Sequence, residues 1–433
     1  MDRVKVAIVG FGTIGSGVAR LLLENGDRVS RRAGRRVELA RIVDTDLTRP
    51  RNVTVPKKLL TDDLSKVTGD PEIVAVLQLI GGLEPERTIM LQLLAAGKDV
   101  ITANKALLAE HGPELFDRAR QLGRSIAFEA SVGGGIPIIA AIGQCLSANQ
   151  IHSVHAILNG TSNFILTQME ERDADYAAAV AEAQERGYAE ADPTLDVDGS
   201  DAAQKLAILA HLAFGARIGW KDIPRTGIDT VEVADLRYAK ELGYSIKLLA
   251  VAELVPEGLE LHVSPTLVRH GTPLAEVRGA YNAIRVVGDA VGRVFFHGLG
   301  AGQMPTASAV VADLIDTVVG RTAITFRTSE LWSSDREAPV AARDPAKIPG
   351  RFYLRLNVED RPGVLARIAG ILGRQHISIA SVIQHETEEE DDNVVPLVIM
   401  THSAPEGAMT ESTDKIDRLS FVRGETVRMR VRD

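Results

Sequence analysis

Two lysines and a run of carboxylates are the residues of this chain best suited to proton transfer. Between Gly187 and Asp201 the sequence carries five carboxylates within twelve residues. Asp201 and Lys205 are four apart in a helical pattern and therefore share a face, which Ile208 and Leu212 continue. Because the rest of this helix is also largely apolar, Lys205 is predicted to be buried. Burial lowers the pKa of a lysine and nearby carboxylates raise it, a balance that suits proton transfer.

Two other interpretations of this segment stay open at this point. Asp201 and Lys205 could form a structural ion pair at a helix start. The dense carboxylates could also hold Ca²⁺, although their spacing does not fit the EF-hand pattern.

A second lysine follows the fourth expected strand, in the sequence Thr102-Ala103-Asn104-Lys105. Ligands of open α/β sheets bind at the carboxyl ends of the strands, so Lys105 is placed to meet a substrate or a nicotinamide. Gly81 and Gly82, after the third strand, should lie at the same edge. The alternatives are a surface lysine in a first helical turn and glycines that only cap a turn.

A glycine-rich turn near the N-terminus indicates a dinucleotide site. Residues Gly10, Phe11, Gly12, Thr13, Ile14 and Gly15 match G-x-G-x-x-G between a buried strand and a helix. Gly10 permits the tight turn, Gly12 lets the backbone approach a pyrophosphate, and Gly15 lets helix and strand pack closely. The helix N-terminus offers N–H donors to the phosphates. The alternative is an ordinary glycine-rich βα turn.

The choice between NAD and NADP is left open by the second strand. Asp44 ends that strand, where an acidic residue accepts from the ribose hydroxyls of NAD. It lies farther from the glycines than usual, after an arginine-rich insertion at 28–36. Arg49 and Arg51 follow closely and could meet a 2′-phosphate, or could belong to a solvated loop.

The elements that position these residues fall into three regions. Residues 1–136 alternate strands and helices, which predicts a Rossmann-type parallel α/β sheet that a helix within 304–325 completes. The expected strands are Val4–Val9, Val37–Val43, Ile73–Leu79, Asp99–Thr102 and Ser125–Phe128. Residues 137–303 show helices and then strands, which predicts an α+β domain.

The C-terminal part of the chain predicts a separate small domain. Residues 329–350 are polar with several prolines and are interpreted as a linker. Residues 351–433 indicate a strand, a turn and helix, and further strands, with an acidic hairpin loop at 386–392.

Composition excludes several classes of protein. The 433 residues carry a net charge of −9, which argues against a nucleic-acid partner. No apolar run is long enough to cross a membrane, and no signal peptide is evident. Cys145 is the single cysteine, so no internal disulfide can form and a cytoplasmic location is expected. Its apolar surroundings predict a small core residue.

Together these motifs resemble the homoserine dehydrogenase family. The resemblance rests on GFGTIGSG, TANK, EASVGGGIP, NGTSNFI and GYAEADPTLDVDGSDAAQKL, in the family's order over about the first 320 residues. The segment DRPGVLARIAGIL at 360–372 is similar to the signature of an ACT regulatory domain, which has a ferredoxin-like fold. The resemblance therefore spans essentially the whole chain.

This resemblance implies an NAD(P)-dependent interconversion of L-homoserine and L-aspartate 4-semialdehyde in threonine, methionine and isoleucine biosynthesis. It implies Lys205 as the proton donor and Lys105 as the second catalytic lysine. The implied substrate-binding residues are Glu190, Asp196, Asp201, Lys105, Gly160, Thr161 and Tyr188. The implied cofactor-binding residues are Gly10, Phe11, Gly12, Thr13, Ile14, Gly15, Asp44, Gly81, Gly82, Thr102, Lys105 and Gly302.

The resemblance also implies a cation, an effector and a partner subunit. A Na⁺ ion would bind Glu129 and the carbonyls of Val132, Gly134 and Ile136, since hard cations take oxygen ligands; the alternative for this segment is a hinge. L-threonine would bind the ACT turn at Asp360, Pro362 and Gly363, near a helix N-terminus, unless this domain only mediates dimerisation. The resemblance implies a homodimer or homotetramer, with residues 137–303 as the catalytic and dimerisation domain.

Two rival functions fit these residues less well. A semialdehyde dehydrogenase that acts through a cysteine thioester needs an accessible, activated thiolate, which Cys145 does not resemble. A non-catalytic amino-acid sensor would not be expected to keep Lys105, Glu190, Asp201 and Lys205 together.

Overall fold

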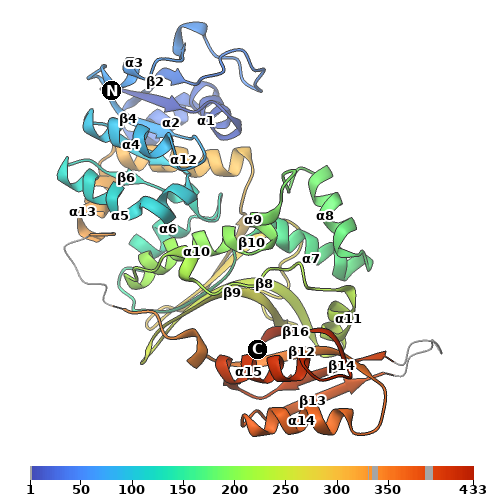
Figure 1. Cartoon of the computed structure of the whole chain (residues 1–433). Helices are drawn as coiled ribbons and strands as arrows, with labels where there is room; N and C mark the ends of the chain where they lie inside the picture. Colours follow the sequence, from blue (N-terminus) through green and yellow to red (C-terminus); the bar gives the residue numbers. More distant parts are fainter. Residues whose placement is uncertain (1, 330, 334–339, 386–393) are drawn as a thin grey trace. The chain divides into compact units, whose positions relative to one another are not determined.

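A computed structural model describes residues 2–329, 331–333, 340–385 and 394–433 of the chain. The chain divides into two compact units (Figure 1). The first comprises Met1–Val154, Gln204–Asp222 and Asn282–Ala341, and the second comprises His155–Ala203, Ile223–Tyr281 and Ala342–Asp433. The acidic hairpin loop expected at 386–392 lies outside the described residues.

The first unit is built on a six-stranded parallel sheet. The strands are β1 (Arg3–Val9), β2 (Arg36–Val43), β3 (Leu60–Thr61), β4 (Ile73–Gln78), β5 (Asp99–Thr102) and β6 (Ile126–Ala127). Their order is β3-β2-β1-β4-β5-β6, the order of a dinucleotide-binding fold, which confirms the expected fold class. All strands are parallel, but β2 and β3 are added on one side of β1 and β4, β5 and β6 on the other. The crevice for a ligand therefore lies at the carboxyl ends of β1 and β4, where the strand order changes direction.

Helices cover both faces of this sheet. They are α1 (Thr13–Glu24), α2 (Gly26–Ala33), α3 (Ser65–Thr68), α4 (Glu86–Ala95), α5 (Lys105–Gln121), α12 (Gln303–Val318) and α13 (Arg321–Ser329). Helix α2 occupies the expected arginine-rich insertion, and it buries Val29 and Ala33 while its arginines face outward. A helix at 304–320 was expected to return to this sheet, and α12 does so by packing beside α1.

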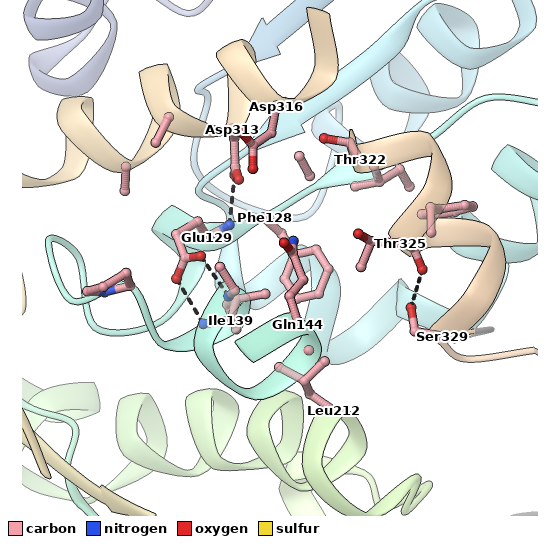
Figure 2. Close-up of a pocket in the computed structure, with 18 of the residues that line it drawn as sticks. Phe128, Glu129, Ile139, Gln144, Leu212, Asp313, Asp316, Thr322, Thr325 and Ser329 are labelled. Atoms are coloured by element: carbon pink, nitrogen blue, oxygen red, sulfur yellow. Dashed lines mark hydrogen bonds between the residues drawn. The ribbon is translucent and has the colours of Figure 1, made fainter. Parts of the chain in front are cut away.

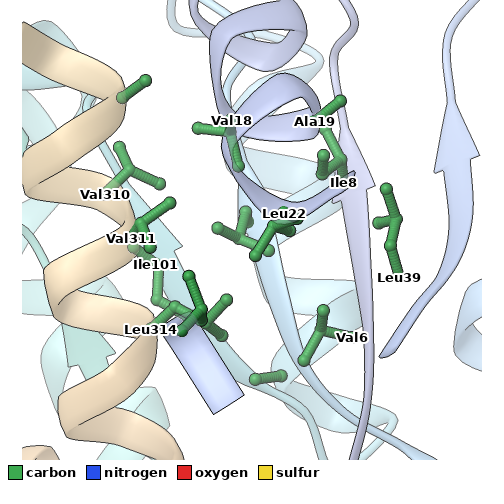
Figure 3. Packing of buried hydrophobic residues seen from close by; sticks show 14 of the residues in the cluster. Val6, Ile8, Val18, Ala19, Leu22, Leu39, Ile101, Val310, Val311 and Leu314 are labelled. Carbon is green, nitrogen blue, oxygen red and sulfur yellow. The ribbon is translucent and has the colours of Figure 1, made fainter. Parts of the chain in front are cut away.

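The core of the first unit lies between the sheet and these two helices (Figure 3). Val6 and Ile8 of β1 are fully buried, and Val18 of α1 and Val310 and Leu314 of α12 close over them. A strand apolar on both faces can only be stable between two helical layers, which explains the continuous apolar run of β1.

The first unit also contains the segment that follows the sheet. Helix α6 (Ile138–Ala140) continues into a π-helical turn at 141–145, and strands β10 (Tyr281–Gly288) and β11 (Gly292–Leu299) lead into α12. Strand β7 (Ile151–Ile157) and helix α10 (Ser200–Phe214) each begin in one unit and end in the other.

The second unit combines helices with a long antiparallel hairpin. The hairpin consists of β8 (Tyr244–Val255) and β9 (Gly258–Arg269), joined by the two residues 256–257. The helices are α7 (Gly160–Arg172), α8 (Tyr176–Glu185), α9 (Thr194–Val197) and α11 (Val233–Glu241). Strand β9 continues through Pro265, opposite Leu248 of β8, although proline is uncommon within a paired strand.

The C-terminal residues of this unit form a ferredoxin-like layer. Its elements are β12 (Pro349–Glu359), α14 (Val364–Arg374), β13 (Ile379–Gln384), β14 (Val394–Thr401), β15 (Ala404–Pro405), α15 (Glu406–Asp417) and β16 (Val422–Arg432). The sheet order is β16-β12-β14-β13. Strand β16 also pairs in parallel with β9, through Arg430 to Arg432. This layer therefore continues the sheet of the β8–β9 hairpin.

The described parts of the expected linker pack against the protein. Leu331 and Trp332 are buried in the first unit, and Ile348 is buried in the second. Among the described residues, none of the helices combines the length and the apolar character that a membrane crossing requires.

Candidate active site

The glycine turn after β1 has the close contacts that its sequence requires. Gly10 has a φ of +98°, and a Cβ there would lie 2.8 Å from Ile80. A Cβ on Gly15 would lie 2.0 Å from the carbonyl oxygen of Gly10, so only glycine allows α1 to approach β1. A Cβ on Gly12 would meet nothing within 4 Å. The turn is closed toward the sheet and open at Gly12, as a pyrophosphate site needs.

The end of β2 is tied to this turn by a carboxylate and a guanidinium. Asp44 accepts hydrogen bonds from the N–H groups of Phe11 and Asp46. Arg51 lies 3.6 Å from Oδ1 of Asp44, the oxygen that accepts from Asp46. It donates to the carbonyl of Phe11 at 2.6 Å and covers the Phe11 ring. Arg51 thus holds the turn together, and it also donates to the carbonyl of Arg49 at 2.8 Å.

Lys105 is positioned by Asn104, a residue that sequence analysis did not single out. Asn104 caps α5 by accepting from the Leu107 N–H, and its Nδ2 donates to the carbonyls of Ile80 (3.2 Å) and Gly82 (2.8 Å). The Thr102 hydroxyl accepts from the Asn104 N–H. The first turn of α5 is therefore fastened to the loop after β4, which places Lys105 at the ligand edge of the sheet. An Asn directly before a helix is the sequence signal for such a cap.

Lys205 lies in a helix that is buried along most of its length. All residues from Asp201 to Ala210 are buried, and Lys205 itself is 9% exposed. Asp201, one turn earlier on α10, is 4% exposed. The predicted burial of Lys205 is therefore confirmed.

The helices of Lys105 and Lys205 are joined by a histidine and a tryptophan. His211 of α10 accepts from the Trp332 N–H at 2.6 Å and bonds to the Ala216 carbonyl at 2.9 Å. The Trp332 ring stacks on His211 with centroids 4.3 Å apart and packs on Phe116 of α5 at 4.5 Å. Burial lowers the pKa of His211 to about 4, so the ring is neutral at physiological pH. Sequence analysis missed this link because the two residues are 121 positions apart.

The carboxylates of the second unit are organised by Asn159, which sequence analysis also missed. Asn159 caps α7 by accepting from the Ser162 N–H, while its Nδ2 donates to Asp196 at 2.7 Å and to Asp201 at 2.9 Å. The Ser162 hydroxyl donates to the Asp196 carbonyl. One buried amide thus holds two of the five carboxylates together, and it fixes both relative to the start of α7.

The remaining substrate-site candidates lie at the start of α7, on the loop between α8 and α9, and on α9. The Thr161 hydroxyl donates to the Tyr188 carbonyl at 2.7 Å, and the Tyr188 ring lies 4.9 Å from that of Phe164. Tyr188 is 46% exposed, and Glu190 is exposed. Asp196 is partly buried, whereas Gly160 begins α7. The buried end of this group is therefore Asp196 and Asp201, and Glu190 lies at its solvent end.

The segment after β6 begins with a buried carboxylate, Glu129, and continues into a glycine loop (Figure 2). Glu129 is 6% exposed, and its two oxygens accept from the N–H groups of Ile139 and Ala140, each at 2.8 Å. A Cβ on Gly134 would lie 2.4 Å from the Gly300 carbonyl oxygen, and φ of Gly134 is +54°. Burial raises the pKa of Glu129, and the nearby Asp316 raises it further.

This donor set fits a hard cation in its chemistry. The buried Glu129 carboxylate is the kind of oxygen ligand that a hard cation takes, and the carbonyls of Val132, Gly134 and Ile136 would have to supply the others. The Ile136 N–H donates to the carbonyl of Gly133, and the Ile138 N–H donates to the carbonyl of Ile136. These two hydrogen bonds fix the conformation of the loop. In the described residues, no group of three or more His, Cys, Asp or Glu side chains is arranged to hold a metal. The candidate site would thus depend on a single carboxylate and on carbonyls.

A second buried carboxylate lies beside Glu129 on the wall of a cavity of about 260 Å³ (Figure 2). Asp313 of α12 accepts from the Glu129 N–H at 2.8 Å. Burial raises the pKa of Asp313 well above its ordinary value, and the charge of Glu129 adds to this effect. The folded protein therefore keeps a proton that the unfolded chain releases once the pH exceeds about 3.9.

Asp313→Asn is expected to stabilise the protein at neutral and alkaline pH. The stability of the wild type should fall as the pH rises from about 4. Above this pH the Asp313 carboxyl is deprotonated in the unfolded chain but still protonated in the folded protein, so folding requires the uptake of a proton. Asparagine keeps an acceptor for the Glu129 N–H and does not titrate. The melting temperature of the variant should exceed that of wild type at pH 8, and the difference should close toward pH 4.

Asp316→Asn is the matched control for this prediction. Asp316 lies one turn along the same helix, is 31% exposed and pairs with Arg321. Its charge also raises the pKa values of Glu129 and Asp313, so Asp316→Asn should stabilise the protein at pH 8 by less than Asp313→Asn does. A gain for Asp313→Asn that does not change with pH would contradict the assignment of a buried protonated carboxyl.

The expectation for Cys145 was wrong, because this side chain is exposed. The apolar run at 138–146 forms one short helical turn and then a π-helical turn, which directs Ala141, Ile142 and Leu146 inward and Cys145 outward. Helical periodicity over a regular α-helix would have placed the sulfur differently.

Comparisons with known proteins agree with this arrangement. Residues 10–129 match the family described as "Homoserine dehydrogenase, NAD binding domain", and residues 137–315 match "Homoserine dehydrogenase". Residues 352–418 match the ACT domain.

Relatives extend the match to the whole chain. A homoserine dehydrogenase of Pseudomonas aeruginosa is 43% identical over 100% of this chain and 99% of its own. The crystal structure of a homoserine dehydrogenase from Thiobacillus denitrificans is 41% identical, with a TM-score of 0.91 over 100% of this chain and 99% of that chain. A hyperthermophilic archaeal homoserine dehydrogenase mutant in complex with NADPH is 25% identical, with a TM-score of 0.61 over 72% of this chain and 97% of that chain. The chain therefore belongs to the homoserine dehydrogenase family of oxidoreductases, with an NAD-binding domain and a C-terminal ACT domain.

Proposed function

We propose that the chain interconverts L-homoserine and L-aspartate 4-semialdehyde with NAD(P), as a step in threonine, methionine and isoleucine biosynthesis. The observation that carries the proposal is Lys205, which lies buried on α10 one turn after Asp201. Asp201 in turn shares the amide of Asn159 with Asp196. An aldehyde that becomes an alcohol needs a proton donor at its oxygen, and an amino acid needs carboxylates for its ammonium.

In this proposal the bound nicotinamide supplies or accepts the hydride, and the residues of the chain manage charge and protons. Lys205 donates a proton to the carbonyl oxygen and takes it back in the reverse direction. Lys105 adds a second positive charge, which stabilises the alkoxide as it develops. Asp196 and Asp201, with Glu190, bind the substrate ammonium. Gly160, Thr161 and Tyr188 line the substrate pocket.

The cofactor would bind through the glycine turn. Gly10, Phe11, Gly12, Thr13, Ile14 and Gly15 would hold the pyrophosphate, with Gly81, Gly82, Thr102, Lys105 and Gly302 at the nicotinamide end. Asp44 supports a ribose with free hydroxyls, and the positive charges of Arg49 and Arg51 support a 2′-phosphate. The activity must therefore be measured with both NAD⁺ and NADP⁺.

Steady-state kinetics with the purified chain test this function. L-homoserine with NAD⁺ or NADP⁺ should give reduced nucleotide, and L-aspartate 4-semialdehyde should consume it. Replacement of NaCl by choline chloride at equal ionic strength should lower the activity if Glu129, Val132, Gly134 and Ile136 hold Na⁺. Binding of reduced nucleotide without turnover of either substrate would overturn the enzymatic proposal and favour an amino-acid sensor.

We further propose feedback regulation by L-threonine through the ACT domain. Gly363, with a φ of +93°, precedes α14, and the Asp360 side chain accepts from Gln384 at 3.2 Å. An α-carboxylate would bind the N-terminus of α14, beside Asp360 and Pro362. Threonine should lower the rate and raise the melting temperature, while Gly363→Ala, which strains the left-handed position, should reduce both effects. No change in rate or melting temperature with threonine would overturn this part.

The expected context of the enzyme also remains a proposal. A cytoplasmic location rests on the single cysteine, which cannot form an internal disulfide. A homodimer or homotetramer is proposed, and light scattering on the purified chain distinguishes both from a monomer.

A further inference from the structure

A cavity of about 330 Å³ lies in the second unit, and its lining includes neither Asp196, nor Asp201, nor the ACT turn at 360–363. Its walls come from the segment 224–226, from the middle of β9, from the start of α15 and from the end of β16. Three arginines, one on segment 224–226 and two on β16, line it together with one histidine and one glutamate: Arg225, Arg428, Arg430, His262 and Glu406.

His262 on the cavity wall is a buried polar group that lacks a partner. It is 3% exposed, and its Nε2 has no hydrogen-bond partner among the described residues. Its Nδ1 lies 3.2 Å from the Ser264 hydroxyl. Burial lowers the pKa of His262 well below its ordinary value, and the charges of Arg430 and Arg432 add to this effect. In the tautomer whose Nδ1 accepts from the Ser264 hydroxyl, the neutral ring carries its proton on Nε2, which is then a donor.

A buried donor of this kind is costly unless a ligand or water accepts from it. Few native polar groups are left in this state, and those that are often mark a functional site. An acceptor placed in the cavity would satisfy it.

The charge of the cavity selects for an anion. Glu406 accepts from both Arg428, at 3.0 Å, and Arg430, so one carboxylate serves two guanidinium groups. Arg225 adds a third positive charge, and His262 adds none. Arg430 is 9% exposed, and burial lowers its pKa. The lining therefore carries two more positive than negative charges in a partly enclosed space, where an oxyanion would be held by charge-assisted hydrogen bonds.

The cavity wall is in direct contact with the loop that carries the substrate carboxylates. The Thr226 N–H donates to the carbonyl of Val263, and the Ile228 N–H donates to that of Val197. A Cβ on Gly227 would lie 2.5 Å from the Val197 carbonyl oxygen. The segment 224–228 is thus pressed between β9 and the residues that separate Asp196 from Asp201, with no space to absorb a shift.

We propose that this cavity binds a small oxyanion, a carboxylate or a phosphate, and that its occupancy is coupled to the substrate loop through segment 224–228. Arg225, Arg428 and His262 provide the donors, and Arg430 with Glu406 forms the floor. The binding part stands on its own, whereas the coupling part rests on the proposed function, because it places the substrate beside Asp196 and Asp201.

Calorimetric titration of the full-length chain with inorganic phosphate, and separately with succinate, tests the binding part at constant ionic strength. Wild type should bind one equivalent of at least one probe, and the arm that binds identifies the chemistry. Arg428→Gln and Arg225→Gln each remove one positive charge from the lining and should weaken that binding at least tenfold. Arg225 is exposed, so its replacement does not depend on refolding a buried site.

Arg423→Gln is the matched control. Arg423 lies on the same strand as Arg428, is 51% exposed and pairs with Glu359, outside the cavity. It should bind the probe like wild type. The site is overturned if neither phosphate nor succinate binds, or if both cavity variants bind the probe as wild type does. Phosphate that binds at the nucleotide turn instead would give the same heat in both variants, and this result would also count against the proposal.

The coupling part has a separate measurement. The saturating probe should shift the KM for L-homoserine in wild type and in Arg423→Gln, and leave it unchanged in Arg428→Gln. Binding without any shift in KM overturns the coupling and leaves the site. Absence of turnover in every protein would instead overturn the proposed function, while the calorimetry would still decide the binding.

Discussion

Lys205→Ala is expected to lower kcat by about a hundred- to ten-thousand-fold, the usual contribution of a positioned proton donor. Lys205 is only 9% exposed, so little bulk water can reach this position and take over as the proton donor. The affinity for NAD(P)H should not change, because the glycine turn at Gly10–Gly15 belongs to another segment. Steady-state kinetics, with fluorescence titration of the nucleotide, measure both quantities.

Two further variants separate proton transfer from charge and packing. Lys205→Arg keeps a cation, but its guanidinium does not release a proton near neutral pH, so kcat should stay low. Lys221→Ala is the control, since that lysine is 63% exposed in its side chain and pairs with Glu110 at 2.9 Å. It should retain wild-type kinetics. Near-wild-type kcat for Lys205→Ala would remove this residue from the mechanism.

Arg355→Met is expected to destabilise the second unit by about 3–5 kcal/mol, the usual result of leaving one partner of a buried ion pair without its counter-charge. Asp235 of α11 is 0% exposed and accepts from Arg355 of β12 at 2.7 and 3.0 Å and from the Tyr353 hydroxyl at 2.9 Å. Methionine keeps the apolar volume but not the charge. Urea denaturation of the full-length chain should show the loss as an earlier transition.

Arg351→Met is the matched control on the same strand. Arg351 pairs with Asp433 at 2.6 Å but is 33% exposed, so its removal should cost less than about 1 kcal/mol. The double variant Arg355→Met with Asp235→Asn removes both charges and should recover part of the loss. Equal effects of Arg355→Met and Arg351→Met would show that burial of the first pair has no energetic consequence.

Local patterns predicted the first unit well, because its signals are local. A buried strand, a glycine turn and a helix succeed one another within about twenty residues, and Gly10 and Gly15 are required by contacts inside that stretch. The burial of Lys205 also follows from one helix. The family resemblance then supplied roles for residues whose positions alone are ambiguous, such as Glu190.

Contacts between distant segments could not be predicted in the same way. Asn159 joins Asp196 and Asp201 across some forty residues, and Asp235 meets Arg355 across 120. Helix α15, which no pattern indicated, contains several Ser, Thr and Asp residues with weak helix propensity, and it is stabilised by packing on β16. Each of these features depends on tertiary structure that a single window of sequence does not contain.

The parallel pairing of β16 with β9 makes removal of the C-terminal layer hazardous. Without β16, the backbone groups of β9 near Thr266–Val268 would lose their partners and leave an open sheet edge. Open, apolar edges recruit strands from other molecules, and natural proteins rarely leave them uncovered. A shortened chain that ends before Pro349 is thus a poor test of regulation, because aggregation would be confused with loss of the effector site. Point changes in the intact chain avoid that ambiguity.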